Sequence, residues 1–428
     1  MAADDEPAGR SEGGATPRRL ACSDCGATFA DRWRCECGAP LNFADPPVPD
    51  RPAPEPGRLS PDPEKGDESL DARDGLWAFA DFLAVGDDPA DRVTLGEGIT
   101  PLVDADGPAV TGEGGDATAA AAPDLDGADG EAAGDSAPWN AAFKLEYVFP
   151  TGSFKDRGAT ATLTRARELG VDRVVEDSSG NAGAAIATYA ARAGVAAEIY
   201  VPADVKDAKL RAIRRAGAEP VRVEGSRADV TEACLAALGS DDAGGDAWYA
   251  SHAWNPAFFE GTATVAYEIA AQRGWDAPDA VVTPLGHGTL FLGAYRGFRR
   301  LERAGWIDEA PRLYGAQAAG VAPIVRERHG PAAADPEGRV NAAADGIQIA
   351  EPVREAEIHA ALDETGGDAL AVTEADASRE LDRLHAAGFY TEPTCAVAPA
   401  ALRALRASGE IAADDDVVVP LTGSGLKS

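Results

Sequence analysis

The segment Thr151-Gly152-Ser153-Phe154-Lys155-Asp156-Arg157-Gly158 places a lysine between a strand-like stretch and the start of a helix. Only six of the 39 basic residues of this chain are lysines, so each of them is individually informative. A lone lysine is ordinarily a solvated surface group. A lysine that bonds covalently to a carbonyl compound must instead be partly desolvated, so that its amine is neutral and nucleophilic. The small and polar neighbours of Lys155 favour this second interpretation.

Strand-like and helix-like segments alternate regularly around this motif and after it. Strands are predicted at 143–147, 171–176, 196–201, 220–223 and 280–283, and helices at 158–169, 182–192, 208–215, 228–238, 261–272 and 290–303. Such alternation predicts an α/β fold with a mainly parallel sheet. In these folds ligands bind at the carboxyl ends of strands, where loops lead into helices.

Two glycine-containing loops fall at such positions. One is Ser178-Ser179-Gly180-Asn181, and the other is Pro284-Leu285-Gly286-His287-Gly288-Thr289. Backbone amides and the helix N-terminus that follows the second loop suit a phosphate dianion. Each loop alone is also compatible with an ordinary strand-to-helix turn, so their weight comes from occurring together with Lys155.

The lysine segment resembles the cofactor-lysine motif of the fold-type-II, tryptophan synthase β-like pyridoxal-phosphate enzymes. Its GSFKDRG form is closest to the threonine synthases. Four further segments are similar to motifs of the family and follow its order: LGEGITPL at 95–102, SSGNAG at 178–183, PLGHGT at 284–289 and LTGSGLK at 421–427. The resemblance spans residues 93–427 apart from an acidic insertion. It implies two α/β subdomains around a cofactor cleft.

The resemblance also implies roles for individual residues. Lys155 carries the cofactor and is the catalytic general base. The implied cofactor-binding residues are Lys155, Asn181, Gly286, His287, Gly288, Thr289 and Thr422, and the implied substrate-binding residues are Thr100, Lys144, Ser178, Ser179 and Asn181. Asn181 meets the ring hydroxyl of the cofactor, and Thr422 meets the pyridine nitrogen. A neutral hydroxyl at that nitrogen biases the chemistry toward elimination and replacement.

The implied activity is that of a carbon–oxygen lyase, which converts O-phosphohomoserine and water to threonine and phosphate. Phe258 and Ala263 stand where the family often has arginine and lysine, which removes two cations suited to a phosphorylated substrate. A sister enzyme is therefore an alternative, either a β-replacement synthase of the cysteate or cysteine type or a serine/threonine dehydratase. A catalytically silent zinc-ribbon protein that binds the cofactor or a partner is a further alternative, which intact Lys155, Asn181 and Thr422 disfavour.

Four early cysteines, Cys22, Cys25, Cys35 and Cys37, form a CxxC and a CxC pair. Four thiolates suit a closed, structural zinc site, although reduced cysteines without metal are the alternative. We therefore predict a zinc ribbon over residues 1–45, as in some archaeal relatives, and a proline-rich linker over 46–75. The catalytic domain then covers 76–428, with a solvated low-complexity insertion at about 104–138.

The chain carries a formal net charge of −33, from 72 acidic and 39 basic residues. This surface favours a salt-adapted protein of a halophilic archaeon over an ordinary acidic one, and it argues against nucleic acid or membrane partners.

The N-terminus is acidic with no apolar stretch after it, so we expect no signal peptide. The few cysteines favour the cytoplasm. The resemblance implies a homodimer that acts on a small amino-acid substrate.

Overall fold

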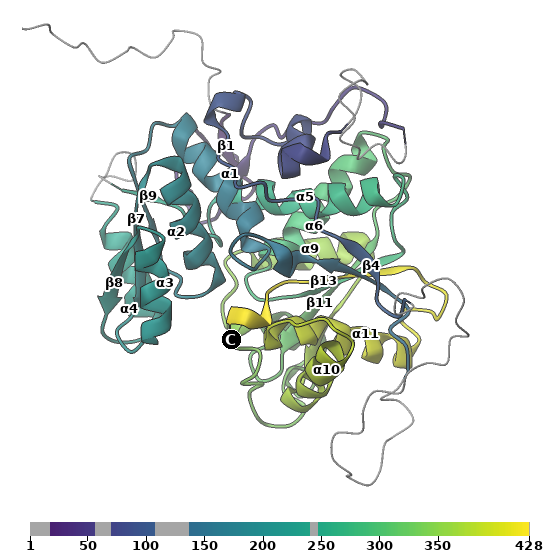
Figure 1. The fold of residues 1–428 in the computed structure, drawn as a ribbon. Helices are drawn as coiled ribbons and strands as arrows, with labels where there is room; N and C mark the ends of the chain where they lie inside the picture. The colour runs from purple at the N-terminus through teal and green to yellow at the C-terminus, as the bar shows by residue number, and fades with distance from the viewer. Residues whose placement is uncertain (1–17, 56–69, 108–136, 240–246, 428) are drawn as a thin grey trace, which may run out of the picture.

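The computed structural model describes residues 18–55, 70–107, 137–239 and 247–427, and these fold around three sheets (Figure 1). The strands are β1 Leu20–Cys22, β2 Thr28–Phe29, β3 Leu41–Phe43, β4 Leu102–Asp104, β5 Ala142–Leu145, β6 Arg173–Glu176, β7 Ala196–Pro202, β8 Glu219–Val223, β9 Trp248–Tyr249, β10 Ala280–Pro284, β11 Arg312–Ala318, β12 Ala369–Val372 and β13 Val417–Leu421. The α-helices are α1 Lys155–Glu168, α2 Asn181–Ala193, α3 Asp207–Arg215, α4 Arg227–Ala236, α5 Pro256–Gln272, α6 Thr289–Arg303, α7 Pro323–His329, α8 Pro331–Ala334, α9 Glu355–Thr365, α10 Glu374–Ala386 and α11 Val397–Ser408. The 3₁₀ segments are η1 Ala72–Phe82, η2 Pro89–Asp91, η3 Glu146–Val148, η4 Asp345–Ile347, η5 Pro393–Ala396 and η6 Gly425–Lys427.

The larger subdomain is built on a six-stranded sheet in the order β12-β11-β10-β13-β5-β4, parallel except for β4. Its central strands are apolar on both faces, as parallel strands covered by helices must be. Val281 of β10 packs into the cluster that contains α5 and α6, and the next residue, Val282, packs into the cluster that contains α11. The sheet therefore lies between two helical layers.

The smaller subdomain is a four-stranded sheet in the order β8-β7-β6-β9, and every pairing in it is parallel. Val174 on β6 packs with α1 and α2, whereas the neighbouring Val175 packs with α4 on the opposite face. This subdomain lies on the left of Figure 1, beside the larger one. The predicted α/β fold with two subdomains is confirmed, and each predicted strand and helix is present, with its ends shifted by a few residues.

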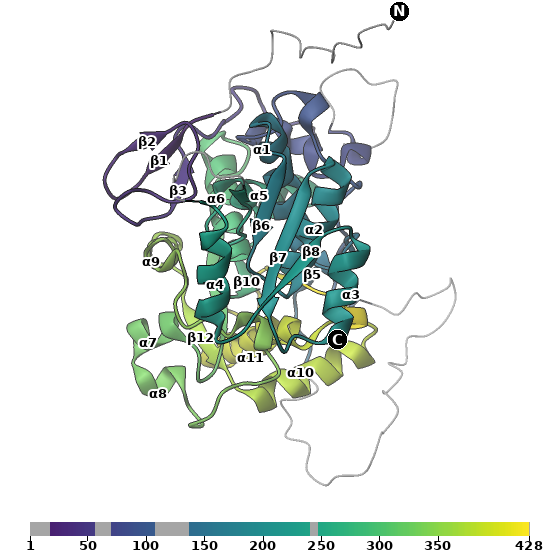
Figure 2. The same ribbon diagram turned by 90° about the vertical axis from the view of Figure 1, so that its left-hand side faces the viewer.

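The N-terminal β1–β3 sheet contacts both subdomains and lies at the upper left of Figure 2. Trp33 packs edge-to-face against Tyr249 and Trp254, with ring centroids 5.5 and 5.1 Å away. On its other side, Arg354 donates a hydrogen bond of 2.8 Å to the Leu41 carbonyl. These contacts fix the cysteine-bearing module in the junction between the subdomains.

Two predicted segments lie partly outside the described residues. The low-complexity insertion at 104–138 is described only at 104–107 and 137–138, and the linker at 46–75 only at 46–55 and 70–75. The described part of the linker is attached to the larger subdomain, because Trp306 donates to the Arg51 carbonyl and Trp275 to the Pro54 carbonyl. Among the described residues, no helix has both the length and the apolar character needed to cross a bilayer.

Candidate active site

Lys155 is the first residue of α1, and the turn before it lies against the C-terminal segment. The Phe154 amide donates to the Thr422 carbonyl at 3.0 Å, and the Ser424 amide donates to the Gly152 carbonyl at 2.9 Å. Gly152 has φ = +77°, a conformation that L-residues with side chains rarely adopt. Residues more than 260 positions apart are thus joined, and this junction fixes the backbone position of Lys155 beside the C-terminal segment.

The amine of Lys155 lies 3.8 Å from the centroid of the Phe154 ring. Burial lowers the pKa of Lys155 to about 8, although Glu392 and Glu176 act in the opposite direction. A lysine with this pKa has a substantial neutral fraction near neutrality, which a solvated lysine lacks. The amine is therefore suited to nucleophilic attack and to proton abstraction.

The loop 284–289, which the sequence predicts to be the phosphate cup, joins β10 to α6. Gly288 precedes the helix with φ = +79°, and α6 has no side-chain cap, so its first amides remain open to a ligand. A Cβ on Gly288 would meet the buried Ile358 side chain at 2.7 Å, so a larger residue would collide with the core beneath the loop. Nearby buried polar atoms that lack a hydrogen-bond partner include Ser153 Oγ, His287 Nδ1 and Thr391 Oγ1. Uncapped amides and orphaned polar atoms fit a bound phosphate-bearing cofactor.

The loop 178–181 joins β6 to α2, with Asn181 as the first helical residue. A Cβ on Gly183 would meet the Ser178 carbonyl oxygen at 1.8 Å, so only glycine allows the loop to fold back this closely. The Asn181 side-chain amide donates to both oxygens of Glu392, at 3.0 and 3.1 Å. Burial raises the pKa of Glu392, while Asn181, Lys427 and Lys155 act to lower it.

Glu392 is a site residue that sequence reasoning missed, because it lies 211 positions from Asn181. The only local signal was the Glu392-Pro393 step, which begins η5.

Thr422 follows β13 and is almost completely buried. Its hydroxyl lies 3.3 Å from Cys395 Sγ, and the same sulfur accepts from the Gly423 amide at 3.0 Å. Burial raises the pKa of Cys395 to about 12, so it stays a neutral thiol. Cys395 therefore packs behind Thr422 and helps to hold its hydroxyl.

Thr100 and Lys144 are placed in a buried charge network beneath the site. Lys144 Nζ donates to the Thr100 carbonyl, to Glu268 and to Gln272, at 2.7, 2.7 and 2.9 Å. All three of its hydrogens are thereby used. The Thr100 hydroxyl donates to Glu146 at 2.7 Å. Their assignment to the substrate stays a prediction, and in this arrangement Lys144 has no donor left to offer.

Phe258 and Ala263 lie on α5 and have no exposed surface. The Phe258 ring fills the space above Gly158, where a Cβ would come within 2.1 Å of it. Since both positions are sealed core positions, neither supplies a cation to the cleft.

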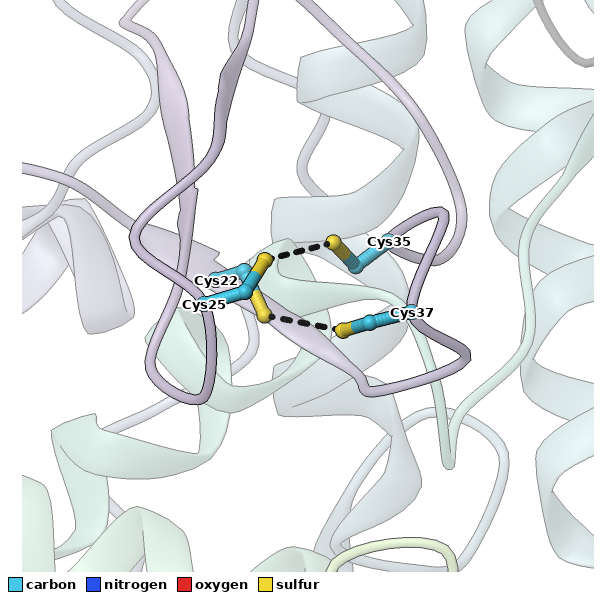
Figure 3. A group of neighbouring side chains, drawn as sticks. All are labelled: Cys22, Cys25, Cys35 and Cys37. Carbon is cyan, nitrogen blue, oxygen red and sulfur yellow. Dashed lines mark hydrogen bonds between the residues drawn. The ribbon is translucent and has the colours of Figure 1, made fainter.

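The four N-terminal cysteines converge from two turns (Figure 3). Cys22 Sγ lies 3.6 Å from Cys37 Sγ, and Cys25 Sγ lies 3.4 Å from Cys35 Sγ, with all four sulfurs within 4.8 Å of one another. A zinc–sulfur tetrahedron with bonds of about 2.3 Å has edges of about 3.8 Å. Burial acts to raise the pKa of Cys22, but the amides of Cys25 and Asp24 outweigh it and lower it to about 7. The residues fit a tetrahedral metal.

Residues 132–423 match the family described as pyridoxal-phosphate dependent enzymes. The chain therefore belongs to the pyridoxal-phosphate-dependent enzymes, and its fold is that of fold type II. It is 36% identical to the threonine synthase of Methanosarcina acetivorans over 289 residues, which cover 66% of this chain and 70% of the relative. It is 31% identical to that of Mycobacterium leprae over 354 residues, covering 82% and 88%. Within its family, the chain is threonine synthase-like.

Solved structures agree on the fold. A processed threonine deaminase from Solanum lycopersicum superposes with a TM-score of 0.56 at 22% identity, covering 67% of this chain and 76% of that one. Serine racemase from Dictyostelium discoideum gives a TM-score of 0.52 at 22% identity, covering 66% and 86%. At this level of identity, the likeness concerns the architecture alone.

Proposed function

We propose that this chain is a threonine synthase, which converts O-phosphohomoserine and water to threonine and phosphate. The observation that carries the proposal is the proximity of three features. The Phe154 amide beside the desolvated Lys155 is bonded to Thr422, and the charge of Lys155 acts on His287, just before the uncapped α6 N-terminus. The identity to archaeal and mycobacterial threonine synthases supports the choice of reaction. The absence of cations at Phe258 and Ala263 keeps β-replacement and dehydration as alternative activities.

The predicted site residues other than Thr100 and Lys144 each have a role in this proposal. The amides of residues 286–289 would hold the cofactor phosphate, Asn181 would meet its ring hydroxyl, and the neutral Thr422 hydroxyl would meet its ring nitrogen. Bound pyridoxal phosphate supplies an electron sink for the carbanion formed at the substrate α-carbon. Lys155 anchors the cofactor and, once released, removes the α-proton. Ser178 and Ser179, at the start of α2, bind the substrate carboxylate.

The reaction is tested by following phosphate and threonine together. We expect the purified protein, assayed in molar salt, to release phosphate from O-phosphohomoserine and to form threonine in equal amount. Phosphoserine, serine and threonine serve as competing substrates in parallel assays. Turnover of one of these without any turnover of O-phosphohomoserine would contradict the proposal and select the sister activity.

We further propose that the cysteine module is a structural zinc ribbon. The near-tetrahedral spacing of Cys22, Cys25, Cys35 and Cys37 supports this assignment. Elemental analysis should find one zinc ion per chain, and Cys25→Ser should lose it and melt at a lower temperature. Cys234→Ala, at a buried cysteine outside the cluster, is the control and should keep its zinc. A zinc-free wild-type protein that is equally stable would contradict the assignment.

We also propose a salt-adapted, cytoplasmic homodimer. The net charge of −33 supports salt adaptation, and the six free cysteines suit a reducing compartment. Dimerisation rests on resemblance to the family, and size measurement in molar salt tests it.

A further inference from the structure

A buried acid–imidazole pair lies at the same edge of the cleft as the asparagine loop. Glu176 is the last residue of β6, and His252 follows β9. Because these strands are parallel neighbours, their carboxyl ends meet at one edge of the sheet. His252 Nδ1 lies 2.7 Å from Glu176 Oε1. The Glu176 side chain is fully buried, whereas that of His252 keeps 10% of its surface exposed.

The pair faces the cofactor cup of the other subdomain. The ring of His252 meets that of His287 edge-to-face, with centroids 5.4 Å apart. The positive charge of Lys155 acts to lower the pKa of both His252 and Glu176, so these three groups interact electrostatically. Glu176 Oε2 and His287 Nδ1 are buried without hydrogen-bond partners among the described residues. Orphaned polar atoms of this kind are rare in folded proteins and indicate a place for a ligand or water.

The two members of the pair have opposite protonation preferences. Burial, together with Asp177, raises the pKa of Glu176 well above its usual range, whereas Arg227 and Lys155 act to lower it. Burial and the charge of Lys155 lower the pKa of His252 to about 3, and burial and His252 lower that of His287 to about 3. When Glu176 is ionised and His252 carries its single proton on Nδ1, a proton that reaches Nε2 displaces the Nδ1 proton onto the Glu176 carboxylate. The imidazole stays neutral, and the carboxyl group stores the proton.

We propose that His252 is a second acid–base residue of this site, and that Glu176 orients it and stores its proton. This inference rests on the proposed function. Conversion of O-phosphohomoserine to threonine needs proton transfer at the β-carbon besides the α-proton that Lys155 removes. His252 Nε2 takes the β-proton while the γ-carbon–oxygen bond breaks and phosphate leaves with the bonding electrons. The stored proton then returns to the γ-carbon, which becomes the methyl group. Water adds its hydroxyl at the β-carbon and gives its proton to the departing phosphate, and Lys155 returns a proton to the α-carbon.

The test separates the two proton transfers in the holoenzyme. His252→Asn should exchange the substrate α-hydrogen with deuterated solvent within about threefold of the wild-type rate, because Lys155 is intact. Its phosphate release should fall about 100-fold or more, as expected for the loss of an acid–base group. His359→Asn removes a histidine that is paired with Glu327 on the surface, and this control should leave both rates unchanged. Equal loss of both rates in His252→Asn, or loss of neither, would overturn the proposal.

A second measurement does not depend on turnover. In nitrogen-15 spectra of the wild-type holoenzyme, His252 should remain neutral from about pH 8 to about pH 5, with its proton on Nδ1 wherever Glu176 is ionised. Glu176→Gln should change that tautomer balance and leave His359 unaffected. A His252 signal that does not respond to Glu176→Gln would overturn the positioning role of Glu176. If the wild type releases no phosphate from O-phosphohomoserine, the proposed function fails. The spectra still test whether Glu176 orients His252, because they do not depend on turnover.

Discussion

Lys155→Ala is expected to abolish the visible absorbance of the bound cofactor and to lower turnover by about 10⁴-fold or more. The variant loses the covalent attachment and the α-carbon base together, and each effect alone is large. Burial lowers the pKa of Lys155 to about 8. Lys144 cannot take over its role, because Lys144 Nζ is held in a buried ion pair with Glu268. The measurement is the absorbance spectrum of the purified holoenzyme, followed by phosphate release.

Lys206→Ala is the matched control, because Lys206 is an exposed lysine that precedes α3. It should keep both the absorbance and the activity. A Lys155→Ala protein with an undiminished visible band would show that the cofactor is attached elsewhere, and the assignment of the cleft would fail with it.

The lysine motif was predictable because its information is local. A strand, a tight turn and a helix start place Lys155 at a carboxyl edge, and the order of the glycine loops predicts the rest of the fold. Glu392 was not predictable in this way, since its contact with Asn181 depends on the packing of two subdomains. The same holds for Glu176 and His252, which meet only because β6 and β9 are neighbours.

Lys144 illustrates a second limit of sequence reasoning. A strand over residues 143–147 was predicted, but alternation alone does not say which face of the strand turns toward the cleft. In the structure, Phe143 packs into the cluster with α11, and Lys144 points the other way, toward Glu268 and Gln272 on α5. Lys144 therefore has a structural role in the buried ion-pair network, because its strand faces Glu268 on α5.

Arg157→Met is expected to destabilise the folded protein by about 3–5 kcal/mol, the cost of removing one partner from a buried ion pair. The Arg157 side chain is fully buried between Glu146 and Glu268, with nitrogen–oxygen distances of 2.6 and 2.5 Å. Its removal leaves those carboxylates with Lys144 as the remaining nearby cation. Denaturant titration of both proteins measures the difference in the free energy of unfolding.

Salt distinguishes this network from the many ion pairs of the surface. Arg379→Met removes an exposed pair with Asp376 and should cost at most about 1 kcal/mol. The cost of Arg157→Met should persist in molar salt, because buried charges are poorly screened, whereas the small cost of Arg379→Met should shrink. If Arg157→Met and Arg379→Met lose the same free energy of unfolding, and both losses shrink in molar salt, Arg157 does not belong to a buried network. Lys144→Met provides a milder second variant, since it leaves the Arg157 pairs intact.

The pH dependence follows from Glu268. Burial acts to raise its pKa, but Arg157 and Lys144 outweigh burial and lower the pKa to about 2, from an ordinary value of 4.5. A depressed pKa contributes stability above the unfolded value, and that stability is lost as the pH falls toward the folded one. The difference between wild type and Arg157→Met should therefore be full at neutral pH and narrow between about pH 4.5 and pH 2. A difference that widens in this window would show that Glu268 is not the ionised partner. The contact between α1 and α5 would then depend on apolar packing, and the ion pair between Arg157 and Glu268 would not stabilise it.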